Sequence, residues 1–140
     1  MELFNEKHKS IMNERFSKDC LISLATSVDN LPYVRIVDAV FSEDSFYIIT
    51  YNLSNKMNQI RINDNVAIAG EWFTGFGKVI NLGWFNNIEN KQIADKLKEA
   101  FSSWIDNGHN NFSDKNTIIL RIKLSNGVLF SNGTKYQFEF

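Results

Sequence analysis

The stretch FYIITYNLSNKMNQIRI (residues 46–62) contains the change of pattern around which the chain is organised. Residues 46–51 are aromatic and β-branched with apolar side chains on both faces, which is typical of a strand covered on both sides. Ser54 then interrupts this pattern and is a good helix N-cap. Met57 and Ile60, which are three residues apart, predict a short helix that ends at the polar residues 63–65. A strand is therefore expected to run directly into a short helix.

The first turn of that helix is a candidate anion site. A helix N-terminus offers free backbone N–H groups and about half a positive charge. Here Ser54, Asn55 and Lys56 add a hydroxyl, an amide and an ammonium group. A group the size of a phosphate suits these donors. The same residues also suit a capped surface helix with an ordinary exposed lysine, so the pattern leaves both interpretations open.

Length and composition favour one globular domain, residues 1–140. Lys and Arg number 15 against 16 Asp and Glu, so no basic excess is available for nucleic acid or an anionic membrane surface. Cys20 is the single cysteine, which excludes an intramolecular disulfide. No apolar run approaches the ~18 residues of a membrane span, and the N-terminus lacks the apolar core of a signal peptide. We therefore expect a cytoplasmic protein.

Two further features of the composition bear on function. The chain holds 12 Phe and 3 Trp, many for its length, so part of this aromatic surface is expected at a subunit interface or a ligand pocket. His8 and His109 have no Cys, Asp or Glu at metal-ligand spacing. We expect both histidines at the surface and no metal site. The nucleotide, zinc-protease and serine-hydrolase motifs GxGxxG, GxxxxGK[ST], HExxH and GxSxG are absent.

The remaining elements predict a mainly β fold. Helices are expected at residues 5–16 and 87–106, and strands at 20–26, 33–41, 66–72 and 76–82. Residues 117–140 are expected to form a meander with turns at Asn126-Gly127 and Asn132-Gly133. Tight turns between most strands predict an antiparallel barrel or a strongly bent sheet with helices at its ends.

Two local features stand out within these strands. Gly70, Gly75 and Gly77 lie close together, which indicates a bulge or a close approach of another backbone or a ligand. The strand at 33–41 carries Arg35 on one face and Asp38 on the other. Charged groups on both faces of an apolar strand need a sheet end or charged partners nearby.

Four patterns, taken in chain order, resemble the FMN-binding split barrel of the pyridoxamine 5'-phosphate oxidase-like family, in particular its short general-stress-protein-like members. They are LAT followed by a turn and proline (24–32), PYVRIV (32–37), ITYNLSNKMNQI followed by NDNVAI (49–68), and FGKV in the glycine-containing strand (76–79). The resemblance implies a Greek-key-like antiparallel split β-barrel. It also implies a homodimer with FMN at the subunit interface and a small-molecule substrate.

The resemblance also implies which residues contact the cofactor. It matches Arg35 and Lys56 to the phosphate ligands, with Ser54 and Asn55 completing the phosphate site. Further contacts are implied for the ribityl chain and the ring: Thr50 and Tyr51, the backbone of Ile36 and Val37, Gln59 from the helix, and Trp72 or Phe73 from the other subunit.

This sequence departs from the family pattern in ways that bear on activity. At the position matched to Asn55, pyridoxamine phosphate oxidases have an arginine. The asparagine is therefore expected to weaken phosphate binding. The chain ends at Phe140, without the C-terminal region that supplies substrate-phosphate ligands in those oxidases. We therefore do not expect pyridoxamine phosphate oxidase activity itself.

The leading hypothesis is an FMN-dependent oxidoreductase that acts on an unknown small acceptor. No residue is an obvious general acid or base, and Asp38, Tyr51 and Glu71 are the nearest candidates. A non-catalytic flavin-binding or flavin-storage protein, or a relative that holds haem or a deazaflavin in the same cleft, fits this absence equally well. A small β-barrel dimer that uses its aromatic surface only for association is the third alternative.

Overall fold

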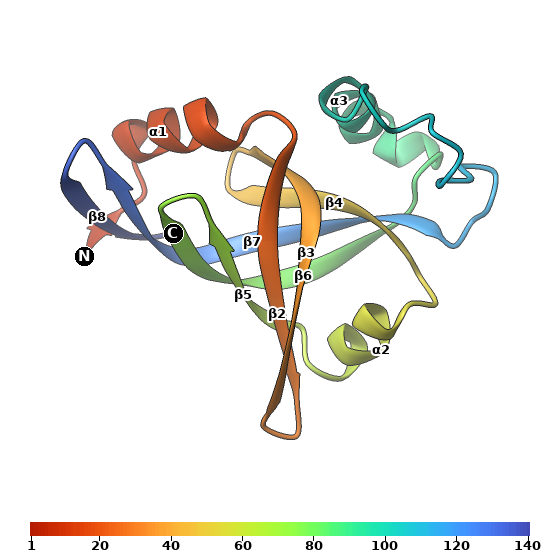
Figure 1. Cartoon of the computed structure of the whole chain (residues 1–140), viewed down its shortest axis with the longest axis horizontal. Coiled ribbons are helices and arrows are strands. Elements are labelled where there is room, and N and C mark those ends of the chain that lie inside the picture. Colours follow the sequence, from red (N-terminus) through yellow and green to blue (C-terminus); the bar gives the residue numbers. More distant parts are fainter.

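Six strands close into an antiparallel barrel in the computed structural model, which describes residues 1–140 (Figure 1). Their order around the barrel is β7, β4, β3, β2, β5 and β6, and β6 pairs back onto β7. The expected antiparallel, mainly β split barrel is confirmed. The strands are β2 (Cys20–Val28), β3 (Leu31–Ser42), β4 (Ser45–Tyr51), β5 (Asn65–Gly70), β6 (Phe73–Trp84) and β7 (Thr117–Ser131), extended beyond the barrel by β8 (Thr134–Glu139) and the short parallel β1 (Glu2–Leu3).

The helices lie outside the barrel. They are α1 (Glu6–Phe16), α2 (Asn55–Ile62) and α3 (Lys91–Ala100), and a short 3₁₀ turn, Ile88–Asn90, precedes α3. The helix predicted over 87–106 is therefore too long at both ends. Phe101 and Ile105 are still buried, but turns carry them inward. Apolar spacing reports which side chains are buried and does not require that the helical backbone continue. None of the helices has the length and apolar character needed to cross a membrane.

β4 is covered on both faces, as its sequence predicts. Phe46 and Ile48 point into the barrel core, which also receives Phe16 from α1 and Met57 from α2. The alternate residues of β4 face a second, smaller core between the outer surface of the sheet and α3. Burying apolar area on both sides makes β4 the shared wall of the two cores.

The barrel is split between β3 and β4. These strands pair only where Val40–Ser42 meets Ser45–Tyr47. Beyond that point β4 pairs with β7 and leads into α2, whereas β3 pairs with β2 along the full length of β2. The β2–β3 hairpin therefore extends past the barrel as an arm (Figure 1). Residues 31–39 of β3 have no strand partner on the β4 side, so this edge has backbone groups free to bind a ligand.

The expected turn at Asn126-Gly127 does not form, because β7 runs straight through it. A Cβ on Gly127 would lie 2.7 Å from a ring carbon of Phe73 and 2.8 Å from one of Phe138. This glycine therefore serves close packing and not a change of direction. The second expected turn is confirmed, since Asn132 and Gly133 both have left-handed φ angles, of 50° and 77°.

The glycine-rich strand also behaves as predicted. The register between β6 and β7 shifts between Phe76 and Gly77, which marks a bulge. A Cβ on Gly77 would lie 2.5 Å from the carbonyl oxygen of Lys123, so the backbones approach closely there. Both outcomes predicted for these glycines, a bulge and a close backbone approach, occur at Gly77.

The prediction that His8 lies at the surface is wrong. Its side chain is 1% exposed and packs against Phe138 and Tyr136 of β8, with ring centroids 5.0 and 5.8 Å away. Its Nδ1 accepts a hydrogen bond from the backbone N–H of Asn5 at 3.2 Å, which completes the capping box of α1. His109 is exposed, as expected.

Candidate functional site

Arg35 points into the gap between the β2–β3 arm and α2. It lies opposite Leu24 of β2, and its Nη1 donates to the Thr26 hydroxyl at 2.9 Å and to the Leu24 carbonyl at 3.3 Å. Its Nη2 donates to Oε1 of Gln59 from α2 at 2.6 Å. The Thr26 hydroxyl donates to the same Gln59 oxygen at 2.6 Å. Neutral oxygens from two elements therefore fix the guanidinium in place.

Lys56 reaches the same place from the first turn of α2. Its Nζ donates to the hydroxyl of Thr50, at the end of β4, at 2.5 Å. Burial, with a further contribution from the positive charge of Arg35, lowers the pKa of Lys56 below 10.5. Burial likewise lowers the pKa of Arg35. Lys56 at the strand-to-helix junction and Arg35 on β3 are therefore two half-buried cations within electrostatic range of each other.

Neither cation has an acidic partner. The ion pairs of the protein join His8 to Glu2, Lys9 to Glu43, Lys78 to Asp64, Lys91 to Asp95, and Arg121 to Asp44. Two partly buried positive charges without a carboxylate are costly in the empty protein. The arrangement therefore favours an anionic ligand at this point.

Ser54 adds an unused hydroxyl to the site. It has extended backbone angles at the N-cap of α2, as predicted, but its side chain makes no capping hydrogen bond. Its Oγ is buried and has no hydrogen-bond partner. A buried hydroxyl without a partner is costly, and a bound oxyanion would satisfy it. We call Thr26, Arg35, Thr50, Ser54, Lys56 and Gln59 the cradle.

The other residues expected at the site lie in different surroundings. Asn55 is exposed at the first position of α2, and Tyr51 is exposed at the end of β4. The backbone of Ile36 and Val37 lies on the unpaired edge of β3, next to Arg35. Phe73 is buried in the barrel core at 2% exposure, so its ring is not available at the surface.

Thr26 was not among the residues expected to contact the cofactor. It is 2% exposed and bonds to both Arg35 and Gln59. The LAT pattern already indicated the face that Thr26 occupies, because alternation along the strand puts Thr26 on the same face as Leu24. The missing information was the register that sets this face beside Arg35.

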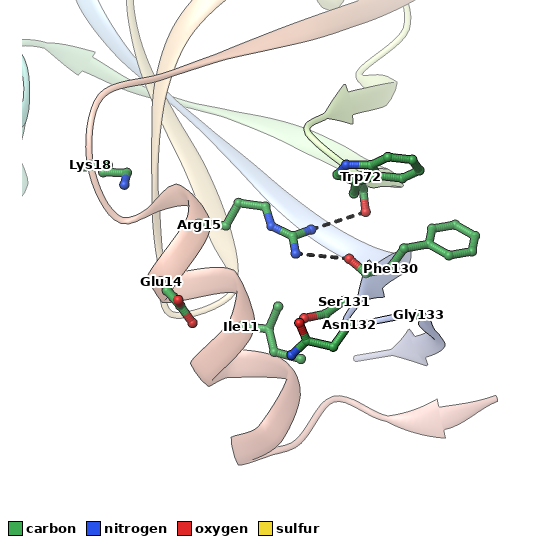
Figure 2. Close-up of a pocket in the computed structure, with 9 residues that line it drawn as sticks. All are labelled: Ile11, Glu14, Arg15, Lys18, Trp72, Phe130, Ser131, Asn132 and Gly133. Carbon is green, nitrogen blue, oxygen red and sulfur yellow. Dashed lines mark hydrogen bonds between the residues drawn. The ribbon is translucent and has the colours of Figure 1, made fainter.

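Trp72 belongs to a different part of the surface (Figure 2). Its backbone has a left-handed φ of 52°, and Arg15 of α1 donates to the carbonyls of Glu71, Trp72 and Phe130 at 3.1, 3.4 and 3.0 Å. Arg15, Trp72 and Phe130 border a cavity of about 590 Å³ beside α1. The cradle lies beside α2, so a contact between Trp72 and a ligand in the cradle would require a second protomer.

No protein-family model matches the sequence, and no curated protein does. Solved structures, in contrast, share the architecture over nearly the whole chain. A NimC/NimA family protein from Clostridium acetobutylicum is 22% identical and has a TM-score of 0.67, with 99% of this chain and 96% of that chain covered. General stress protein 26 from Bacillus anthracis is 15% identical and has a TM-score of 0.68, with 93% and 98% covered. A protein of the pyridoxinephosphate oxidase family from C. acetobutylicum is 11% identical, with a TM-score of 0.63 and 98% and 97% covered.

The chain has the split-barrel fold of the pyridoxamine 5'-phosphate oxidase-like proteins. On this split barrel, the second core under α3 covers the outer face of the sheet around β4, β7 and Val40 of β3, and leaves the rest of the outer face uncovered. The uncovered part lies on β3, β2, β5 and β6. There Val34, Ile36 and Phe76 are 69%, 68% and 60% exposed, and the register places the small Ala25 and Ala67 between Val34 and Phe76. We call these five residues the bare face.

Proposed function

We propose that the cradle binds the phosphate of FMN. The observation that carries this proposal is the pair of cations, Arg35 and Lys56, that share a half-buried gap with an unpartnered hydroxyl of Ser54 and have no carboxylate nearby. A phosphate monoester carries about −1.5 to −2 charges at pH 7 and has several strong acceptor oxygens. It would neutralise both cations and give the hydroxyl of Ser54 a partner.

We propose that a second copy of the chain covers the bare face. A contiguous apolar patch on a sheet is typical of an interaction surface. Ile36 links the two proposals, because its side chain belongs to the bare face while its backbone lies on the open edge of β3 beside the cradle. A flavin with its phosphate in the cradle would then extend along this edge toward the partner, where Trp72 of the second copy is available.

The activity that we propose is an FMN-dependent oxidoreductase acting on a small acceptor. Bound flavin would supply the electron or hydride transfer. The chain would contribute a fixed phosphate site, the backbone groups of the β3 edge and a cleft between protomers that keeps water from the ring.

A non-catalytic flavin-binding protein is the second candidate, and the lack of an acid or base in the cradle favours it. Asp38 lies on the face of β3 opposite Arg35, and Glu71 lies on the α1 side of the barrel. Proteins with the same fold include a FAD-binding protein from Mesorhizobium loti, the haem storage protein HutZ from Vibrio cholerae and an F420 reductase, with TM-scores of 0.67, 0.62 and 0.60. The cradle has no histidine or cysteine that could ligate a haem iron, which supports a flavin over haem.

Titration with FMN and with riboflavin, followed by flavin fluorescence, tests the phosphate site. Arg35→Ala and Lys56→Ala are each expected to weaken FMN binding by ~1–3 kcal/mol, or about 5- to 150-fold, and to leave riboflavin binding unchanged. Lys78→Ala, which removes an exposed lysine outside the cradle, is the control. Unchanged FMN affinity in both cradle variants would overturn the proposal.

Oxidation of reduced nicotinamide by the FMN-loaded protein separates the two candidate functions. A rate above that of free FMN at the same concentration supports the oxidoreductase. A rate equal to that of free FMN, with FMN binding intact, supports the binding protein.

A further inference from the structure

Two carboxyl groups meet where the region around α3 touches the barrel. Asp19 lies in the turn between α1 and β2, and Trp104 lies in the turns that follow α3. The indole Nε1 of Trp104 donates to Oδ2 of Asp19 at 2.8 Å. The Trp104 ring also packs against Phe101 of the second core, with centroids 4.7 Å apart. This hydrogen bond therefore ties the region around α3 to the turn before β2.

The other oxygen of Asp19 has no donor. Its Oδ1 is buried, and no N–H or O–H group of the protein donates to it. The carboxyl group of Asp38, on β3, lies within hydrogen-bonding reach of Asp19. A carboxylate can only accept, so two ionised groups would repel each other and leave Oδ1 unsatisfied. One proton on Asp38 would remove both costs.

We propose that a protonated Asp38 donates to the free oxygen of Asp19 and so forms a pH-sensitive clasp, which holds Trp104 and the turns after α3 against the barrel and loosens when Asp38 ionises.

The surroundings of the pair leave no other group to neutralise it. Burial, the hydrogen bond to Asp19 and the negative charge of Asp19 together raise the pKa of Asp38 to about 6. Asp19 is the only charged group that acts on Asp38. The neighbouring thiol of Cys20, which bonds to the Ala39 carbonyl at 3.1 Å, stays protonated because burial raises its pKa to about 12. Lys18 is exposed, and its charge slightly opposes the rise in the pKa of Cys20. The indole of Trp104 does not titrate.

This proposal is independent of the flavin site, although the two share a strand. Asp38 is three residues from Arg35 on β3, so the clasp fastens the region around α3 to the strand that carries the cradle. For an acid whose folded-state pKa is raised, stability is lost as pH rises from the unfolded value of about 3.8 toward 6. The clasp is therefore closed in acid and weakened at neutral pH.

Nuclear magnetic resonance of the three indole N–H groups in the flavin-free protein tests the clasp. Trp72 is exposed in the turn between β5 and β6, so its signal serves as the internal control. Trp84 is not a control, because it donates its indole N–H to the carbonyl of Phe112, which lies in the turns after α3. Trp104→Phe identifies the Trp104 signal. We expect the Trp104 signal to shift with a midpoint near 6 while the Trp72 signal stays flat. A flat Trp104 signal between pH 4 and 8 would overturn the proposal.

Asp38→Asn supplies the second, independent readout. The amide of asparagine donates to Oδ1 of Asp19 at every pH, so this variant should keep the clasp closed. Hydrogen exchange at pH 8, compared with intrinsic rates, is expected to be slower across α3 and residues 101–105 in the variant than in the wild type. At pH 4.5 the two proteins should match. Equal protection at pH 8, or a Trp104 titration that persists in Asp38→Asn, would contradict a proton donated by Asp38.

Discussion

Lys56 and Arg35 lie close enough for the charge of Arg35 to lower the pKa of Lys56, yet neither contacts a carboxylate. Each is held instead by neutral oxygens, from Thr50 in one case and from Thr26, Gln59 and the Leu24 carbonyl in the other. Such a pair is strained electrostatically until an anion binds.

Removing the charge of Lys56 should stabilise the ligand-free protein. Because the folded state lowers the pKa of Lys56, stability is reduced at low pH and recovers as pH rises through the folded-state pKa toward 10.5. Lys56→Met is expected to raise the free energy of unfolding by up to ~1 kcal/mol near neutral pH, after allowance for solvent screening, while weakening FMN binding. Urea unfolding measures the first effect. Lys78→Met is the matched control, and destabilisation confined to Lys56→Met would contradict the prediction.

A carboxylate placed beside Arg35 should compete with the phosphate. Gln59→Glu puts a negative charge where Oε1 of Gln59 now accepts from Arg35 at 2.6 Å. The new ion pair is expected to weaken FMN binding by at least ~10-fold, whereas Gln59→Ala, which removes the contact without adding charge, should lose less. Fluorescence titrations at equal ionic strength measure the FMN affinity of both variants. If Gln59→Ala bound FMN more weakly than Gln59→Glu, the contribution of Gln59 would come from holding Arg35 in place and not from the absence of a negative charge.

Charge on the bare face should prevent dimer formation. Val34→Asp and Ile36→Asp each introduce a carboxylate into the proposed interface, where its desolvation opposes association. Sedimentation velocity is expected to show a dimer for the wild type and a monomer for each variant. Ile88→Asp, at a residue that is 84% exposed outside the bare face, should leave the dimer intact. A wild-type monomer at micromolar concentration would refute the interface.

Asp38→Asn should change the pH dependence of stability. Because the pKa of Asp38 is raised, its ionisation costs stability progressively between about pH 3.8 and 6, and the full cost is present at higher pH. The asparagine variant is expected to be more stable than the wild type at pH 7.5 by on the order of 1 kcal/mol, given the partial exposure of Asp38, with the gain fading as pH falls toward 4. Urea unfolding at both pH values measures the difference in the free energy of unfolding between the variant and the wild type. A gain that persists unchanged at pH 4 would point to packing and not to ionisation.

Gly77 should tolerate no side chain. A Cβ at this bulge would lie 2.5 Å from the backbone oxygen of Lys123, which cannot move without breaking the β6–β7 pairing. Gly77→Ala is expected to cost ~1–3 kcal/mol of stability. Gly70→Ala, whose nearest neighbour is the ring of Phe16 at 3.1 Å, should cost less because a side chain can adjust. Thermal unfolding measures the stability lost in each variant. Equal losses in Gly77→Ala and Gly70→Ala would contradict the prediction.

Much of the site was predictable because it is local. The residues that end β4 and begin α2 are adjacent in sequence, so Ser54 and Lys56 were recognisable from propensity and capping alone. The residues alone showed Arg35 only as a charge without an explanation, because its partners come from β2 and α2, and its match to a phosphate ligand came from the family resemblance. Thr26 was missed for the same reason, since a contact across strands depends on a register that no single strand encodes.

Local sequence was enough to predict most of the strands, the N-cap position of α2 and the Asn132-Gly133 turn, because backbone propensity and side-chain periodicity act over a few residues. That Asn126-Gly127 continues a strand depends on tertiary packing, since the rings of Phe73 and Phe138 fill the space beside Gly127. Tertiary packing also decided that the barrel opens between β3 and β4 and that two cations meet in the gap. These outcomes come from packing between segments far apart in the chain, where burial of apolar surface overrides local preference.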